Sequence, residues 1–186
     1  MNLKMERRGK SSRIVILIFF AIFSTWSALQ FLAPLSLPQS SIDDLSGLTA
    51  ISDNEIIISE MTVPWNIIYS VGDRLCHQKT ERSFSINENQ MPFCSRCTAI
   101  WLGLAIGLGF MVFYRIQLNE KFLFVVIGGL VPIGIDGVGQ LFGFWESTNL
   151  MRVVTGLIIG VSCGISIGII IDEIKTFIPF KKTKSN

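Results

Sequence analysis

Charged residues and histidine are scarce in this sequence, and none of the familiar catalytic signatures occurs in it. Only 16% of its 186 residues are charged, against about a quarter in ordinary soluble domains, whereas 49% are hydrophobic. There is no P-loop, G-x-S-x-G, H-E-x-x-H or Rossmann signature. A net charge of +2, with no basic tract interleaved with aromatics, gives no ground for nucleic-acid binding. Four irregularly spaced cysteines do not make a disulfide scaffold. What remains is a membrane protein with one compact domain.

Four apolar runs predict an all-α membrane protein with four transmembrane helices. The expected spans cover residues 14–32, 98–114, 122–142 and 153–171. A basic tail at 1–13 precedes the first run, a pattern that a cleaved signal peptide shares. That run is longer than a usual signal-peptide core and lacks a clear small-x-small cleavage site, so we favour an uncleaved helix. Pro34 and Pro38 are expected to end it.

Small residues recur every four positions in the second and fourth runs. They are Ala99, Gly103 and Gly107 in one, and Gly156, Gly160, Gly164 and Gly168 in the other. Such stripes let helix backbones approach closely. We therefore expect the second and fourth helices to pack backbone to backbone.

Two segments of different character separate the first and second runs. The stretch at 39–62, within an outer loop at 33–63, is polar and acidic, and we expect it to be exposed and poorly ordered, with a short helix or strand at 56–58. From Pro64 the apolar residues follow helical spacing for about 14 residues, which is too short to span a bilayer. We expect a short interfacial helix here, the first part of a segment at 64–97, delivering Cys76 and His77 from its end.

The basic residues are distributed unevenly about the four runs. Eleven of the sixteen lie in the tail at 1–13, the loop at 115–121 and the tail at 172–186, which four spans place on one side of a membrane. The positive-inside rule therefore predicts a multi-pass protein of the cell membrane with both termini in the cytoplasm. Segment 64–97 would then face out of the cell.

Three of the four cysteines and the only histidine fall within 22 residues. Cys76, His77, Cys94 and Cys97 form a Cys3His set, and the C-x-x-C spacing at 94 and 97 suits a single ion, so we expect a zinc site. Two alternatives remain open. One is a structural disulfide, which would leave one thiol over, and the other is a redox-active C-x-x-C. Cys163, inside the last run, is expected to be a packing residue.

Asp136 is an ionisable residue deep in an apolar run, so it requires a partner or a polar cavity. Arg152 is the first choice of partner, with Arg82 or Arg96 as alternatives, and Gln140 lies one turn further along the same face. The carboxylate could belong to a structural ion pair, form a proton or cation site, or act as a base against a metal-bound water. The three arginines could hold an anion such as a lipid phosphate, or merely satisfy carboxylates and helix ends.

Three blocks of sequence, in order, are CHQ…ERSF…MPFCSRCTAI, PIGIDGVGQ and ESTNLMRVVTG. Over about residues 65–165 they resemble the small prokaryotic membrane proteins grouped as domain of unknown function 2085. The family's motif positions fall on Cys76, His77, Gln78, Glu81, Arg82, Ser83, Phe84, Pro92, Cys94, Arg96, Cys97, Thr98, Asp136, Gly137, Gln140, Ser147, Thr148, Asn149, Arg152, Thr155 and Gly156. Ala99 replaces the usual glycine and keeps the small-residue stripe. The resemblance implies a multi-span protein in which the blocks share one site, and it implies no particular activity.

We therefore expect a membrane protein with a zinc site at its outer face, acting on an anionic or lipid-linked substrate. The candidate catalytic residues are Asp136, Arg82, Arg96 and Arg152. The alternative is a non-catalytic transporter or envelope assembly component, whose cysteines form a disulfide or a redox-active pair. Whether the protein is an enzyme stays open. The expected partners are the lipid bilayer, the anionic or lipid-linked small molecule and a second copy of the chain, and nucleic acid is not among them.

Overall fold

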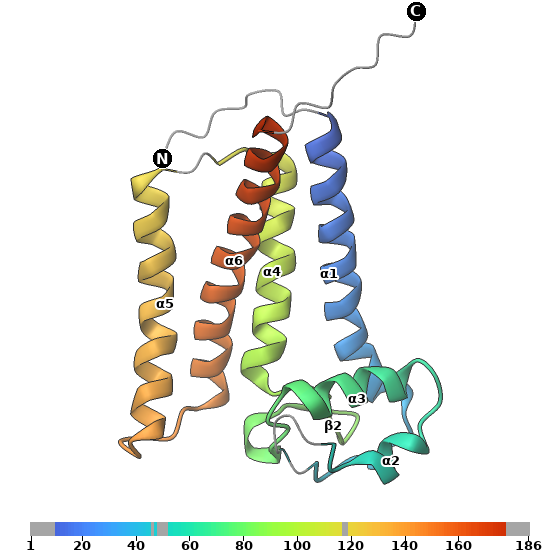
Figure 1. Cartoon of the computed structure of the whole chain (residues 1–186). Coiled ribbons are helices and arrows are strands. Elements are labelled where there is room, and N and C mark those ends of the chain that lie inside the picture. Colours follow the sequence, from blue (N-terminus) through green and yellow to red (C-terminus); the bar gives the residue numbers. More distant parts are fainter. Residues whose placement is uncertain (1–9, 46, 48–51, 117–118, 178–186) are drawn as a thin grey trace, which may run out of the picture.

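The computed structural model describes residues 10–45, 47, 52–116 and 119–177. Within these residues four long helices stand side by side, and a cap of short elements covers the end of the bundle at α1 and α4 (Figure 1). The long helices are α1 (Lys10–Ser36), α4 (Ser95–Phe113), α5 (Glu120–Leu141) and α6 (Asn149–Phe177). Each contains a segment long and apolar enough to cross a membrane. The expected all-α membrane fold is therefore confirmed.

Helices α4 and α6 form the centre of the bundle, and their backbones touch. A Cβ added at Gly103 would lie 2.8 Å from the carbonyl oxygen of Leu157, and one added at Gly164 would lie 2.5 Å from that of Leu104. Both distances are shorter than a Cβ tolerates, so only glycine permits the approach. The predicted packing between the small-residue stripes of the second and fourth spans is confirmed.

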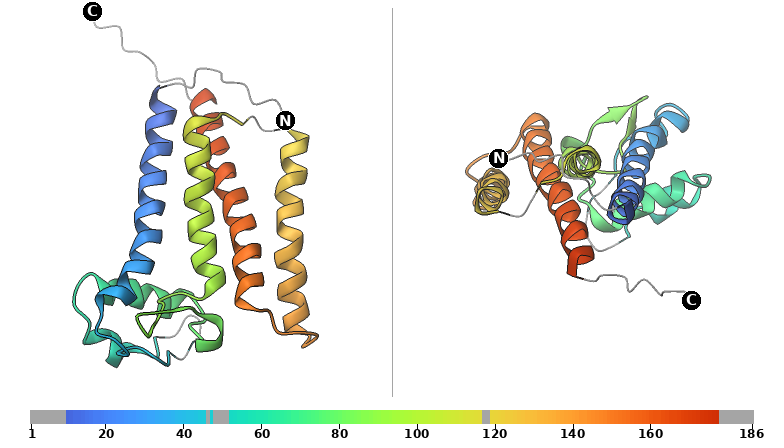
Figure 2. Two further views of the ribbon diagram at one scale, coloured as in Figure 1. Left: turned by 180° about the vertical axis from the view of Figure 1, so that it is seen from behind. Right: turned by 90° about the horizontal axis from the view of Figure 1, so that it is seen from above.

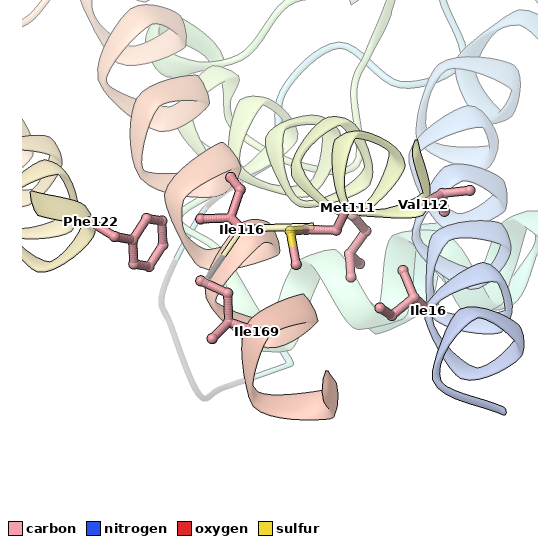
Figure 3. Packing of buried hydrophobic residues seen from close by; sticks show 7 residues of the cluster. Ile16, Met111, Val112, Ile116, Phe122 and Ile169 are labelled. Carbon is pink, nitrogen blue, oxygen red and sulfur yellow. The ribbon is translucent and has the colours of Figure 1, made fainter. Parts of the chain in front are cut away.

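The end of the bundle away from the cap has a core drawn from all four long helices. Its buried members are Ile16 of α1, Leu108, Met111 and Val112 of α4, Ile116 just beyond α4, Phe122 of α5 and Ile169 of α6 (Figure 3). Met111 and Leu108 are completely buried. This core fixes the four helices relative to one another at the end opposite the cap.

Helix α1 continues past Pro34, the first of the two prolines that were expected to end it, and ends at Ser36, two residues before Pro38. Pro34 lies in the last turn, where the proline disrupts little of the helix that follows. The carbonyl groups at this end find other donors, because the Nδ2 group of Asn89 donates to the carbonyl oxygens of Pro34 at 3.0 Å and Pro38 at 2.9 Å. The Oγ group of Ser36 donates to the carbonyl oxygen of Leu32 at 2.9 Å. A side chain far along the chain thus completes the end of α1.

The cap consists of α2 (Glu55–Ser59), α3 (Trp65–Leu75), a 3-10 turn η1 (Thr80–Arg82) and the antiparallel strands β1 (Ser85–Ile86) and β2 (Asn89–Gln90). Helix α3 lies across the bundle end (Figure 1). Its buried residues Ile68 and Tyr69 form one cluster with Ala33 of α1 and with four residues of the segment before α3, Ile42, Leu45, Ile58 of α2 and Met61.

The expectation of an exposed loop at 39–62 is therefore wrong for those four residues, which are buried. Residues 46 and 48–51 lie outside the described part. The four apolar side chains are too widely spaced to form an apolar run in the sequence. They meet only because the chain folds back over α3. The expected short element at 56–58 is the helix α2.

Polar side chains of β2 hold the cap together from inside. The hairpin turns through Asn87 and Glu88, whose φ angles of 55° and 59° suit a two-residue turn of the primed type. The Oε1 atom of Gln90 accepts from the backbone N–H of Leu45 at 3.0 Å, and its Nε2 group donates to the carbonyl oxygen of Gln78 at 2.5 Å. The hydroxyl of Tyr69 donates to the Gln90 carbonyl at 2.7 Å. This network joins the loop, α3 and the segment that leads to α4.

Helix α5 stands at the edge of the bundle beside α6, on the side away from α1 (Figure 2). Much of its surface is apolar and exposed, including Phe124, Val125, Val131, Ile135 and Val138. Asp136 of α5 is nevertheless buried, because it faces inward at the end of the helix near the cap. The loop from α5 to α6 closes over the same end.

Candidate metal and anion site

Three cysteines converge where α3 ends and α4 begins. Cys76 caps the C-terminus of α3, Cys94 caps the N-terminus of α4, and Cys97 lies in the first turn of α4. Their sulfur atoms all lie within 4.8 Å of one another, and the sulfurs of Cys76 and Cys97 are 3.4 Å apart. Among the described residues this is the one group of three or more cysteine, histidine or acidic side chains close enough to hold a metal ion. All three cysteines are free thiols.

Close packing alters the acidity of these thiols. Hydrogen bonds from Cys76 and then Cys97 lower the pKa of the Cys94 thiol, while the hydrogen bond to Cys94 is the main cause that raises the pKa of Cys76. Cys94 is therefore the thiol of this cluster that loses its proton most readily, and thiolate is the form that binds metals. In a tetrahedral zinc site with Zn–S bonds of about 2.3 Å, two sulfurs are separated by roughly 3.8 Å. The observed spacing fits such an ion with little movement.

Helix ends add to this electrostatic environment. The N-termini of α4 and α6 both lie at this end of the bundle (Figure 1), and a helix N-terminus favours negative charge. The backbone N–H of Cys94 also donates to the sulfur of Cys76 at 3.3 Å. Thiolates and other anions are therefore stabilised at this point.

His77, the expected fourth ligand, lies outside the group of three sulfurs and is exposed. The backbone at Cys76 is extended, with φ −136° and ψ 146°, and successive side chains of extended backbone point to opposite sides. This geometry turns His77 away from the sulfurs, and its role as a ligand stays a prediction. Cys163 lies on α6, outside the cluster.

The carboxylate of Asp136 sits among four donors. The Arg96 guanidinium forms an ion pair with its Oδ2 atom, and the Ser147 hydroxyl donates to Oδ1. The Nε2 group of Gln140 donates to Oδ2 at 3.0 Å, and the indole N–H of Trp145 lies 3.4 Å from Oδ1. Because both oxygens already accept hydrogen bonds, the geometry favours an orienting role for Asp136 over that of a base.

The partner of Asp136 is Arg96, the alternative, and not Arg152, the first choice from the sequence. A Cβ at Gly156 would meet the carbonyl oxygen of Arg96 at 2.6 Å, so the missing side chain lets the first turn of α4 lie against α6. This close approach shortens the distance that the Arg96 side chain has to cover to reach α5. Helical spacing in the sequence does not reveal it.

Arg152 is buried, with 5% of its surface exposed, and no carboxylate of the described residues lies within 4.0 Å of it. Its guanidinium donates to the Oδ1 atom of Asn149 at 3.1 Å and lies 3.5 Å from the carbonyl oxygen of Glu81. The guanidinium of Arg152 is repelled by the charges of Arg82 and Arg96 and attracted by those of Cys94 and Asp136. A buried guanidinium without a paired carboxylate, close to two others, is well suited to bind an anion.

Asn149 joins the first and third of the three sequence blocks. Its Oδ1 atom accepts from the Ser95 hydroxyl at 3.0 Å as well as from Arg152, and its Nδ2 group lies 3.5 Å from the carbonyl oxygen of Ser83. One side chain therefore connects η1, α4 and α6. The structure brings together the cysteines, Asp136 and the three arginines, as the order of the motifs suggested.

Sequence reasoning missed several contributors. Trp145 contacts Asp136 from the loop after α5, and Ser95 contacts Asn149. Ser147, one of the motif positions named from the sequence, contacts Asp136 from the same loop as Trp145. Gly72 of α3 approaches the carbonyl group of Pro92 so closely that a Cβ has no room there. A glycine inside an amphipathic helix, next to no turn, was the one signal in the sequence for that contact.

The family model described as a predicted membrane protein, DUF2085, matches residues 76–170. The chain is 34% identical over 97 residues to an uncharacterised protein of Methanocaldococcus jannaschii, covering 50% of this chain and 61% of that protein. It is 34% identical over 91 residues to an uncharacterised protein of Methanothermobacter thermautotrophicus, covering 49% of this chain and 82% of that protein. The match thus spans less than two thirds of the first relative. No solved structure matches the chain. The matched region starts at Cys76 and contains the three clustered cysteines, Asp136 and the three arginines.

Proposed function

We propose that this chain, which belongs to the DUF2085 family of predicted membrane proteins, holds a zinc–thiolate centre beside an arginine-lined anion site. Together they would act on an anionic, lipid-linked substrate at the membrane surface. One observation carries the proposal: three cysteine sulfurs from two separate segments lie within 4.8 Å of one another, and Asn149 links Ser95, the residue after Cys94, to the buried guanidinium of Arg152. That guanidinium has no carboxylate partner among the described residues.

The donor set supports zinc as the ion. Three sulfur ligands suit a soft or borderline metal, and the separations match zinc–thiolate geometry. Cys76, Cys94 and Cys97 would hold the ion, which supplies a Lewis acid able to polarise a bound oxygen. Three protein ligands leave one tetrahedral position, which a water, an anion or His77 could take.

The arginines support an anionic substrate. Arg152 is the most buried of the three arginines, while the side chains of Arg96 and Arg82 are 23% and 33% exposed. The positive charges therefore extend from the surface to the buried guanidinium of Arg152. Asp136, Gln140 and Ser147 hold Arg96 in place. The site lies at one end of four apolar helices, where a phosphate on a lipid carrier would come within reach.

Metal analysis of the detergent-purified full chain tests the zinc centre. We expect about one zinc per chain in the wild type and in Cys163→Ser, and less than a fifth of that in Cys94→Ser and Cys97→Ser. Cys163→Ser is the matched control, because it removes a thiol from α6 and leaves the cluster intact. No bound metal in the wild type, or equal metal in all four proteins, would overturn the zinc centre.

Thermal unfolding with added ligands tests the anion site. We expect inorganic phosphate and a short-chain phosphatidic acid to raise the melting temperature of the wild type by several degrees. Arg152→Gln should abolish the shift, Arg152→Lys should weaken it because lysine cannot bind an anion in a fork, and Arg74→Gln on the exposed cap surface should leave it unchanged. A response to the lipid alone indicates a lipid-linked substrate. No response to either ligand would remove the anion site.

A structural or redox disulfide is the second candidate, and the 3.4 Å between the sulfurs of Cys76 and Cys97 favours it, since a small shift would allow the bond. It predicts one alkylatable thiol in this cluster before reduction and three afterwards, with no metal bound. That outcome would replace the zinc centre with the alternative of a non-catalytic transporter or envelope assembly component.

A further inference from the structure

A second polar site lies in the cap, between α2 and α3. Helices α2 and α3 lie side by side in the cap (Figure 1), and a cleft of about 390 Å³ opens between them. Glu55 of α2 lines it from one side. Asn66, Ser70 and Asp73 of α3 line it from the other, at i, i+4 and i+7, which places them on one face of the helix.

Two acceptor oxygens in this cleft have no donor among the described residues. Asp73 is 1% exposed, and although its Oδ1 atom accepts from the Nδ2 group of Asn54 at 2.5 Å, its Oδ2 atom is buried without a hydrogen-bond partner. The Oδ1 atom of Asn66 is likewise buried and without a partner. Leaving such groups unsatisfied is costly, and for a carboxylate the cost is larger still.

The charge around the cleft is negative. Glu55 lines it, and the charge of Asp53 acts on Asp73. The nearby cation is Arg74, whose side chain is exposed and whose Nε group donates to Ser52 at 3.2 Å. No arginine or lysine of the described residues lies within 4.0 Å of the Asp73 carboxylate. The two unsatisfied oxygens thus lie in a cleft that attracts positive charge.

We infer that this cleft binds a hard divalent cation of the Ca²⁺ class through the Oδ2 atom of Asp73, with Glu55, serine hydroxyls and water completing the shell. The Oδ1 atom of Asn66, two helical turns away, would accept a hydrogen bond from one of these bound waters. Carboxylate, amide and hydroxyl oxygens are the ligands that Ca²⁺ prefers, whereas the sulfur cluster suits zinc. Sites of this kind outside the cytoplasm bind Ca²⁺ with dissociation constants of roughly 0.1–1 mM.

Such an ion would join α2 to α3 at a point three residues before Cys76. It would hold the end of α3, and with it the first of the three cysteines, without being part of the sulfur site. The inference does not depend on the zinc centre, and the two can be tested separately in the same protein.

Calorimetric titration of the chelator-treated full chain in detergent with Ca²⁺, and in parallel with Mg²⁺, tests the site. We expect one saturable Ca²⁺ site per chain, with at least tenfold weaker binding in Asp73→Asn and in Asn66→Ala. The second variant, Asn66→Ala, keeps the test valid if Asp73→Asn fails to fold. Glu60→Gln, an exposed acid just beyond α2, is the matched control and should bind as the wild type does. Cys97→Ser should also bind Ca²⁺ normally, which separates this site from the sulfur cluster.

Absence of Ca²⁺ and Mg²⁺ binding in the wild type at millimolar concentrations would overturn the inference. Unchanged binding in both Asp73→Asn and Asn66→Ala would also overturn it, because the ion would then lie elsewhere. A higher melting temperature in Asp73→Asn, together with no ion binding by the wild type, would show that Asp73 is simply a buried acid.

Discussion

Arg96 joins the two halves of the site through a single side chain. Its backbone lies between Cys94 and Cys97, so any movement of the first turn of α4 moves the sulfurs and the guanidinium together. Its guanidinium pairs with Asp136, which Gln140 and Ser147 hold in turn. The ion pair therefore ties α5, at the edge of the bundle, to the cysteine cluster at the cap.

Asp136→Asn tests this connection at the scale of one residue. We expect it to lower the free energy of unfolding by about 1–3 kcal/mol, because it leaves the charge of Arg96 without its partner. Arg96→Gln should cost clearly less in the Asp136→Asn background than in the wild type. Unfolding of the four proteins in detergent, followed by tryptophan fluorescence, measures both effects, and strictly additive losses would contradict the pair.

At the scale of the helix, the contact between α4 and α6 depends on the absence of side chains. A Cβ at Gly160 would lie 2.9 Å from the Cα atom of Gly103, and one at Gly168 would lie 2.7 Å from the Cγ atom of Met111. The contact runs from the site to the core at the other end of the bundle. It sets the position of both helix N-termini at the site.

Gly160→Ala should therefore separate α4 from α6 and destabilise the protein by about 1–3 kcal/mol, as overpacking does. Gly134→Ala on α5 is the matched control, since nothing lies within 4 Å of the added Cβ. There the better helix propensity of alanine should leave stability unchanged or raise it by up to about 1 kcal/mol. Thermal unfolding distinguishes the two, and similar effects of both changes would argue against the close contact.

The contact of α3 with the chain before α4 predicts an effect on metal content. At Gly72, a Cβ would collide with the carbonyl group of Pro92, two residues before Cys94. Gly72→Ala should push α3 and Cys76 away from the other two sulfurs, and we expect bound zinc to fall below half of the wild-type amount while the total thiol count stays the same. Gly128→Ala, with open space around the added Cβ, should retain its metal. Full zinc occupancy in Gly72→Ala would contradict the coupling.

For the whole molecule, the arrangement of the helices places the start of α1 and the end of α6 at the same end of the bundle, away from the cap (Figure 1). Together with the distribution of basic residues, this predicts that both termini are cytoplasmic and that the cap and site face out. A green fluorescent protein fused after Asn186 should fluoresce, and alkaline phosphatase fused there should be inactive. The reverse result would mean that the protein has the opposite orientation in the membrane. The cysteines would then face a reducing compartment, which would disfavour a disulfide.

Membrane character followed from the sequence alone, because it depends on local composition. Runs of apolar residues the length of a bilayer are helical in any context that excludes water from the backbone. The stripes of small residues likewise predicted which helices touch, since glycine every fourth residue marks one helical face. The grouping of Cys76, Cys94 and Cys97 could be anticipated because two of them are three residues apart and the third ends a predicted helix.

Other features depend on contacts between residues far apart in the chain, which no local pattern encodes. The apolar residues Ile42, Leu45, Ile58 and Met61 form no run, so their burial under α3 appears only in the folded chain. The choice of Arg96 over Arg152 as the partner of Asp136 depends on how closely α4 approaches α6. Asn66 and Asp73 lie in an ordinary amphipathic helix, and each is distinguished only by one buried oxygen that has no donor among the described residues. The sequence by itself determined the helices, the membrane-spanning character and the chemical groups available, because these depend on neighbours along the chain. Tertiary packing decided how those groups pair, because pairing depends on distances between segments that local sequence does not fix.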